Sequence, residues 1–178
     1  MIAIGVDPGL HGAIAVVDTE KGRVLEVVDI PTFETFVGKK KRRRLDEAQL
    51  LNEVIRINGL YHEPHSAALL VTIEQVGPQP KDGAVGAFAF GVVYGSIRMA
   101  FKAAGYRSEH ARPQDWKKAL HVPALKDAAV SRADDLFPQD GGLWRGPRGG
   151  ALPDRAEAAM IARYGAEKLS GPVKEVAA

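Results

Sequence analysis

The first thirty residues constrain the fold most, because they contain three short apolar runs separated by turns. Residues 2–7 and 13–17 are rich in β-branched side chains, and the sequence PGLHG lies between them. Residues 23–30 form a third run, which ends before Pro31. Runs of this length bounded by glycine and proline are typical of strands. Three strands with short connections favour an antiparallel meander.

After residue 45 the sequence alternates between helical and strand patterns. Asp46 is a suitable N-cap for the first helix, with Gln49 in the capping-box position. The continuous apolar run at residues 68–74 is typical of a central strand covered on both faces. A further strand is expected at residues 107–111, and residues 138–152, rich in glycine and proline, are expected to be irregular. The helices are expected at residues 46–60, 84–104, 113–120, 125–136 and about 153–168.

The length of 178 residues suits one α/β domain, expected to cover residues 1–170, with residues 171–178 as a frayed tail. The chain has no cysteine, which excludes thiol nucleophiles, cysteine-ligated zinc and iron–sulfur clusters. No charged leader precedes the first apolar run, and no continuous apolar stretch has the roughly 18 residues needed to span a bilayer. We therefore expect a cytoplasmic protein with no membrane partner.

The formal net charge is only +2, but the positive charge is concentrated in one place. Without one run of six cations the net charge would be −4. Such a run favours a polyanionic partner, because it supplies the phosphate-binding part of nucleic-acid affinity. A solvated loop or a nuclear-localisation signal is the alternative. The candidate DNA-binding residues are Lys39, Lys40, Lys41, Arg42, Arg43 and Arg44.

Four carboxylates are placed where they can converge. Asp7 and Glu74 each end an expected strand, and ligand sites in α/β sheets gather at the carboxyl ends of the strands. Asp154 and Glu157 are three residues apart, so they project from one face of the last helix. Neighbouring carboxylates repel each other, and a divalent cation removes that penalty. Four oxygen donors suit two hard cations such as Mg²⁺ or Mn²⁺.

Each of these features also has a simpler interpretation. An Asp-Pro-Gly sequence is usually a turn, a glutamate at a strand end is usually a surface residue, and acids near a helix N-terminus usually stabilise its dipole. The combination, in this order and on these elements, favours function. Two-metal sites of this kind serve phosphoester cleavage.

On these residues the sequence resembles the RuvC family of Holliday-junction resolvases, particularly its phage-type members, from Met1 to about Lys168. IGVDPGLHGAIAVVD is similar to the family's first motif and IEQVG to its second. GVVYGSIRMA is similar to a helix that carries much of the dimer contact in relatives. RPQDWKK, followed by Lys126, resembles the stretch that supplies lysines to the active site, and LPDRAEAAMIA resembles the C-terminal acidic helix.

The resemblance implies an α/β, ribonuclease-H-like fold with a mixed five-stranded sheet flanked by helices. It implies two Mg²⁺ ions per active site, or Mn²⁺ in their place. For the two lysines, ordinary surface positions are the alternative. The implied metal ligands and catalytic acids are Asp7, Glu74, Asp154 and Glu157, joined in the active site by Lys117 and Lys126.

The resemblance also implies a homodimer that binds four-way DNA junctions and nicks two opposing strands, leaving 5′-phosphate and 3′-hydroxyl ends. Two positions depart from the family pattern: Glu157 stands where relatives usually have aspartate, and Gly77 stands where many bacterial relatives have an aromatic wedge. Phe88, Phe90 and Trp144 are candidates to stack on unpaired bases instead, although each also suits a hydrophobic core.

Three other functions compete with this interpretation. A sugar-kinase or actin-like ATPase also opens with an Asp-x-Gly turn, but it needs a second phosphate loop and normally a second domain. These residues do little to distinguish a junction resolvase from a related nuclease that acts on forks, flaps or RNA–DNA hybrids. A DNA-structure-binding protein without catalysis is disfavoured, because all four acidic positions carry a carboxylate.

Overall fold

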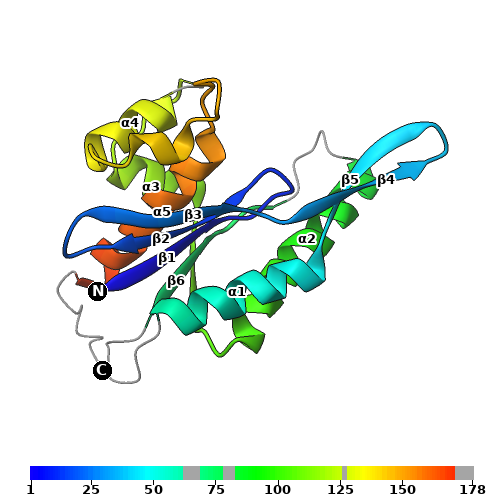
Figure 1. Ribbon diagram of the computed structural model, residues 1–178, viewed down its shortest axis with the longest axis horizontal. Coiled ribbons are helices and arrows are strands. Elements are labelled where there is room, and N and C mark those ends of the chain that lie inside the picture. The colour runs from blue at the N-terminus through cyan, green and yellow to red at the C-terminus, as the bar shows by residue number, and fades with distance from the viewer. Residues whose placement is uncertain (62–68, 78–82, 126–127, 171–178) are drawn as a thin grey trace.

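The structure is a computed structural model and describes residues 1–61, 69–77, 83–125 and 128–170. Its centre is a mixed five-stranded sheet with the strand order β3-β2-β1-β6-β7 (Figure 1). The first three strands form the expected antiparallel meander, while β6 runs parallel to β1 and β7 parallel to β6. The strands are β1 (Ile2–Asp7), β2 (Ala13–Asp18), β3 (Arg23–Asp29), β6 (Leu70–Glu74) and β7 (Ser108–Ala111).

Helices cover both faces of this sheet and give it two hydrophobic cores. One face packs against α1 and α2, and the other against α5, with α3 and α4 beyond it (Figure 1). Asp46 caps α1 as expected, because its Oδ1 accepts the backbone N–H of Gln49 at 3.0 Å. The helices are α1 (Glu47–Tyr61), α2 (Gly83–Ala103), α3 (Pro113–Ala119), α4 (Ala128–Leu136) and α5 (Pro153–Ser170).

Side-chain size differs between the two faces of the central strands. Alternation along β1 directs Ile4 and Val6 into the core beneath α1 and α2, and directs Ala3 and Gly5 towards α5. The facing side of α5 is also built of small residues. Because both surfaces lack bulky side chains, α5 lies unusually close to the sheet, and this position fixes the acids at its first turn. The buried alanines of α5 are Ala156, Ala158, Ala159, Ala162 and Ala166.

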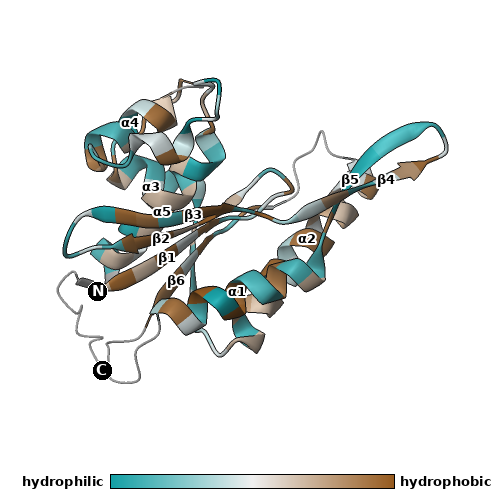
Figure 2. Cartoon of the chain, viewed as in Figure 1, coloured by the Kyte–Doolittle hydropathy of each residue, from teal (hydrophilic) through white to brown (hydrophobic). Residues whose placement is uncertain are grey.

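Two strands that were not predicted from the sequence form a separate antiparallel ribbon. β4 (Thr32–Val37) and β5 (Lys40–Leu45) extend from the sheet as an arm (Figure 1). Gly38, with φ of 60°, opens the two-residue connection between them, as a type II′ hairpin requires. Figure 2 shows the hydrophilic surface of β5 beside a hydrophobic stretch of β4. The basic run is therefore mostly strand.

The segment at residues 138–152 is more ordered than its glycine content predicts. It contains a short 3-10 helix, η1 (Gly141–Trp144), and an isolated bridge between Arg145 and Ala151. Trp144 is fully buried against Phe137. The segment is thus largely irregular, as expected, apart from η1, and one large buried side chain anchors it to the core.

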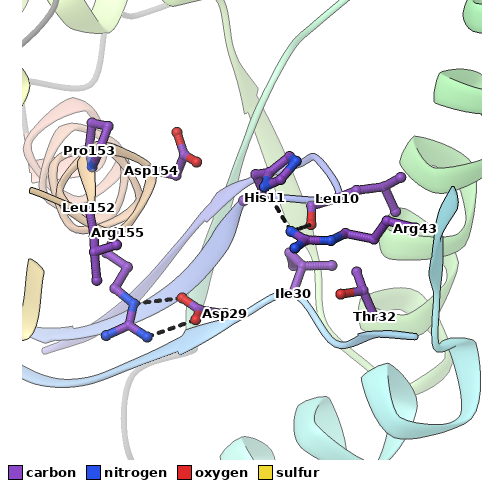
Figure 3. A pocket seen from close by; sticks show the side chains of 11 residues that line it. Leu10, His11, Asp29, Ile30, Thr32, Arg43, Leu152, Pro153, Asp154 and Arg155 are labelled. Carbon is purple, nitrogen blue, oxygen red and sulfur yellow. Dashed lines mark hydrogen bonds and ion pairs between the residues drawn. The ribbon is translucent and has the colours of Figure 1, made fainter. Parts of the chain in front are cut away.

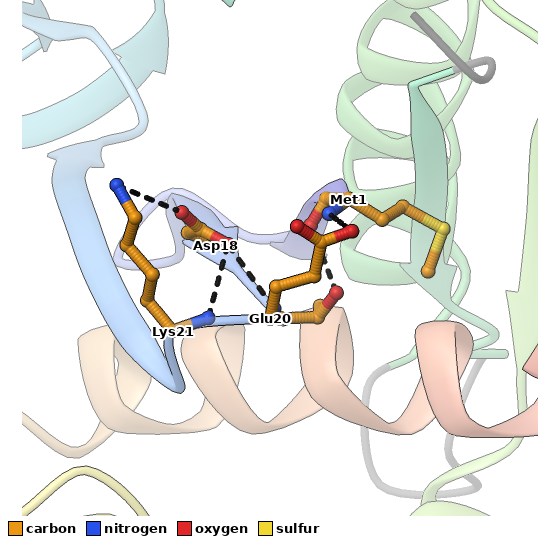
Figure 4. Close-up of polar contacts among 5 residues, drawn as sticks. Met1, Asp18, Glu20 and Lys21 are labelled. Atoms are coloured by element: carbon orange, nitrogen blue, oxygen red, sulfur yellow. Dashed lines mark hydrogen bonds and ion pairs between the residues drawn. The ribbon is translucent and has the colours of Figure 1, made fainter.

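Polar contacts close the end of the sheet that lies away from Asp7 (Figure 4). The amino group of Met1 pairs with Glu20 at 2.9 Å, and Asp18 Oδ1 accepts backbone N–H groups of the β2–β3 turn. These contacts hold the first hairpins in register.

The helix α2 is long and apolar enough to cross a membrane by length and composition alone. The sequence analysis found no such stretch, because small and polar residues interrupt the apolar ones. Alone this is weak evidence, since helices that pack in a protein core pass the same test, and α2 buries Val93, Ile97 and Phe101 against the sheet. The expected frayed tail at residues 171–178 lies outside the described residues.

Candidate active site

Asp7 and Glu74 lie side by side at one edge of the sheet. β1 and β6 are parallel, with Val6 opposite Ile73, so the two acids occupy the next position in register. Two residues before each acid lies a residue that faces α5, namely Gly5 in β1 and Thr72 in β6. The alternation of strand side chains therefore directs both carboxyl groups to the α5 face.

The close approach of α5 brings the second pair of acids to the same place. A Cβ atom on Gly5 would overlap the carbonyl oxygen of Ala158 and the backbone N of Ala162, and a Cβ on Gly165 would overlap the Thr72 hydroxyl. Two glycines thus let the helix backbone touch β1 and β6. Asp154 and Glu157 lie on the first turns of this helix, above the strand ends.

Two side chains of α3 hold the glutamates. The buried indole of Trp116 donates its Nε1–H to Glu74 Oε1 at 2.8 Å, and Lys117 Nζ donates to Glu157 Oε1 at 2.9 Å. Lys117 Nζ also lies 5.0 Å from the centre of the Trp116 ring. Trp116 was missed in the sequence analysis, although it directly precedes the candidate lysine in QDWKK. Lys126 lies outside the described residues.

The electrostatics of the four acids show that they share one site. Burial, which is the largest cause, and the negative charges of Glu74, Asp154 and Glu157 together raise the pKa of Asp7 to about 8, against an opposing effect of Lys117. Burial also raises the pKa of Glu74, and the Trp116 hydrogen bond opposes that rise. The pKa of Asp154 is raised by burial and by Glu157. The predicted convergence of the acids is therefore present in the fold.

The donor chemistry of this site fits hard cations. Its ligands would be carboxylate oxygens, which Mg²⁺ and Mn²⁺ prefer. Neither Asp7 nor Asp154 has a hydrogen-bond or ion-pair partner among the described residues, so both carboxyl groups are available. Within that part of the chain, however, no three His, Asp or Glu side chains surround a common point closely enough to hold an ion as they stand. Ion binding would require these side chains to turn towards one another.

The ribbon geometry divides the basic run between two faces of the arm. Lys41 and Arg43 lie on the inner face, where Lys41 pairs with Glu34 at 2.6 Å and Arg43 contacts the β1–β2 turn. The side chains at alternate positions, on the opposite face, are exposed and have no partner among the described residues. We call these three the outward cations: Lys40, Arg42 and Arg44.

The three aromatic candidates for base stacking have different positions. Trp144 is in the core and donates its Nε1–H to Asp134, so of its two alternatives the core position is the one found. Phe90 is partly buried and stacks on Tyr94. Phe88 is 75% exposed on α2 and is the accessible one of the three.

No family model and no curated protein matches the sequence. Solved structures do match the fold. A structure of Thermus thermophilus RuvC in complex with a Holliday junction substrate is 18% identical with a TM-score of 0.61, over 96% of this chain and 97% of that one. A second T. thermophilus RuvC structure is 17% identical with a TM-score of 0.53, over 94% and 96% of the two chains. The resemblance expected from the motifs is thus confirmed for the fold: this chain has the mixed-sheet, ribonuclease-H-like α/β fold of RuvC.

Proposed function

We propose that this protein is a structure-selective DNA endonuclease that resolves four-way junctions by paired, metal-dependent nicking in recombination and repair. The observation that carries the proposal is the convergence of four carboxylates from β1, β6 and α5, on a fold shared with a protein solved on a Holliday junction. Burial and repulsion among these acids together raise the pKa of Asp7 to about 8, so bound cations would stabilise the cluster by neutralising it.

Asp7, Glu74, Asp154 and Glu157 would hold two Mg²⁺ ions, or Mn²⁺ in their place. A bound cation supplies Lewis-acid activation of water and neutralises charge that develops on the phosphate. The protein itself contributes positioning. Trp116 fixes one oxygen of Glu74, which leaves the other oxygen of that carboxylate for a ligand. Lys117 lies beside Glu157, where its ammonium group can steady the scissile phosphate. Lys126 is proposed for the same role from the sequence alone.

The arm supplies the DNA contact in this proposal. The outward cations lie on one face of a ribbon that extends from the sheet, and they are free to bind the backbone of a junction arm. Contacts of this kind fix position without reading sequence. Gly77 leaves open space after Glu74 at the position where many bacterial relatives have an aromatic wedge.

A homodimer along α2 also belongs to the proposal. Five residues of α2 repeat at alternating intervals of three and four, which is the spacing of a helix–helix seam. Of these, Val85 is 85% exposed, Phe88 75% and Met99 63%. A Cβ atom on Gly91 or Gly95 would meet nothing within 4 Å, so their small size is not needed for packing inside this chain. The seam residues are Val85, Phe88, Val92, Gly95 and Met99.

Cleavage of matched DNA substrates tests the function. Four-way, three-way, fork, flap and linear DNA and an RNA–DNA hybrid are incubated with the protein in Mg²⁺ and in Mn²⁺. We expect paired nicks in the four-way junction that a ligase can seal, no cutting by Asp7→Asn protein that still binds the junction, and normal cutting by Asp135→Asn, which removes an exposed acid of α4. Preferential cutting of forks, flaps or hybrids would assign the related nuclease function. Binding without cutting by the unmodified protein would make it a DNA-structure-binding protein.

A further inference from the structure

A side chain of β5 forms hydrogen bonds with the turn next to the acid cluster. Arg43 Nη1 donates to His11 Nδ1 at 2.7 Å and lies 3.4 Å from the carbonyl oxygen of Leu10 (Figure 3). Leu10 and His11 belong to the turn that follows Asp7, and a Cβ atom on Gly12 would overlap the carbonyl oxygen of Asp7. The turn is therefore tight, and it carries His11 at a fixed position beside the proposed active site.

The hydrogen bond from Arg43 determines which nitrogen of His11 carries the proton. A guanidinium group has only donors, so Nδ1 of the imidazole must accept. The ring is then held with its proton on Nε2, which is left as a donor. Arg43 itself keeps its Nε and Nη2 donors, for which the described residues provide no partner. His11 and Arg43 are thus held next to each other, and each has N–H groups free to bind a ligand.

Both side chains line a cavity of about 350 Å³ that reaches the acid cluster (Figure 3). Asp154 forms part of its wall together with both of these side chains. The other charged groups of the wall are satisfied: Arg155 pairs with Asp29 through two hydrogen bonds of 2.6 and 2.7 Å. Among the described residues, the N–H groups of His11 Nε2 and of Arg43 Nε and Nη2 have no partner, and the hydroxyl of Thr32 also lines the cavity.

We propose that His11 and Arg43 form a phosphate clamp, which binds the DNA backbone phosphate adjacent to the one that is cut. The inference rests on the proposed function, since it takes the acid cluster as the place of cleavage. An anion in this cavity receives Nε2–H of His11 and N–H groups of Arg43, which are charge-assisted hydrogen bonds. The clamp joins the arm to the active site, so a strand bound along the arm enters the acid cluster at a fixed position.

The chain offers a matched control for this clamp. Arg42 and Arg43 are adjacent, both are exposed and both carry one positive charge, yet they lie on opposite faces of the ribbon. Only Arg43 reaches His11. Replacing either arginine with glutamine removes the same charge from the arm, so a difference between the two variants reports the position of the guanidinium group rather than the net charge.

The test is binding to four-way junctions in which single backbone phosphates are replaced by neutral methylphosphonates. The replacement is moved through each phosphate of the junction core, and affinities are measured on Asp7→Asn protein, which leaves the DNA intact. Losing charge-assisted hydrogen bonds to this phosphate should weaken binding at least about tenfold at one position. His11→Ala and Arg43→Gln, each made in the Asp7→Asn protein, should bind unmodified junctions more weakly and lose this position-specific effect. Arg42→Gln should bind more weakly but keep it.

The outcomes separate the clamp from the function on which it rests. If the tenfold effect persists in His11→Ala protein, or if no single phosphate gives such an effect, the clamp is overturned while junction binding and cleavage stand. If the Asp7→Asn protein binds no branched DNA, the proposed function fails and the clamp fails with it. The losses from His11→Ala and Arg43→Gln should also combine to less than their product, because both remove the same site. Fully multiplicative losses would contradict a shared phosphate.

Discussion

The carboxyl group of Asp7 is expected to destabilise the metal-free protein at neutral pH, so Asp7→Asn should make that protein more stable. Burial raises the pKa of this acid, and the charges of Glu74, Asp154 and Glu157 raise it further. Asparagine has nearly the same shape and never ionises. The substitution therefore removes the free-energy cost of protonating this acid on folding. It opens no cavity and breaks no hydrogen bond of the Asp7 carboxyl group to a described residue.

The sign and the size of the effect follow from the two pKa values of Asp7. The ordinary pKa of this acid is 3.8, and its pKa in the folded protein is about 8. Between pH 3.8 and pH 8, therefore, the folded state holds a proton that the unfolded state has released. Stability contributed by this group is complete below pH 3.8 and is lost as the pH rises towards 8. At pH 7 the loss is at most about 4 kcal/mol, and about 3 kcal/mol of it accumulates above pH 4.5.

Urea unfolding in the presence of a chelator, at several values between pH 4.5 and pH 7, measures this difference. The free energy of unfolding of Asp7→Asn relative to the unmodified protein should increase with pH by up to about 3 kcal/mol across this window. Asp135→Asn should show no such trend, because that carboxyl group is exposed. Mg²⁺ should then stabilise the unmodified protein more than Asp7→Asn. A constant difference between the two proteins across the pH range would refute the reasoning.

Four further predictions use the packing, the site and the arm. Gly5→Ala should destabilise the fold by about 3 kcal/mol in urea unfolding, because α5 must move away from β1, whereas Gly59→Ala in α1, which meets open space, should stabilise it by about 0.5 to 1 kcal/mol. Trp116→Phe should cost about 1 to 3 kcal/mol and weaken Mg²⁺ binding at pH 7 in a calorimetric titration, because Glu74 loses its buried donor. Met99→Glu should convert a dimer into a monomer in sedimentation velocity. Glutamine at the three outward cations should lower the salt slope of DNA binding by about 3, measured by fluorescence anisotropy.

The parts of the fold that could be predicted are those with a local hydrophobic period. The strands ending at Asp7 and Glu74 were recognisable as apolar runs that stop at an acid, and the structure pairs them in parallel. The convergence with Asp154 and Glu157 was also predictable, because a sheet edge and one helix face are the two places where such acids meet. The roles of these acids in metal binding and cleavage stay predictions.

Other features depend on contacts between residues distant in the sequence. Trp116 is one position from a candidate lysine, but its bond to Glu74 spans 42 residues and leaves no local pattern. Trp144 lies in a stretch of glycine and proline that is typical of loops, and only the core reached by its ring makes that stretch ordered. Gly5 was recognisable as part of a strand, yet the reason for glycine there is the backbone of α5 more than 150 residues later.

The arm shows why a count of charges cannot describe a binding surface. Lysine and arginine runs have low β propensity and no apolar alternation, so the six cations were expected to act together. Pairing with β4 gives them a two-residue period instead, which separates the outward cations from Lys41 and Arg43. Lys41 is already neutralised by Glu34, and Arg43 is turned towards His11. Three of the strand's five cations are therefore available to a DNA backbone along the arm. The remaining arginine acts where the arm meets the acids, and this division requires a ribbon that a flexible basic loop would not provide.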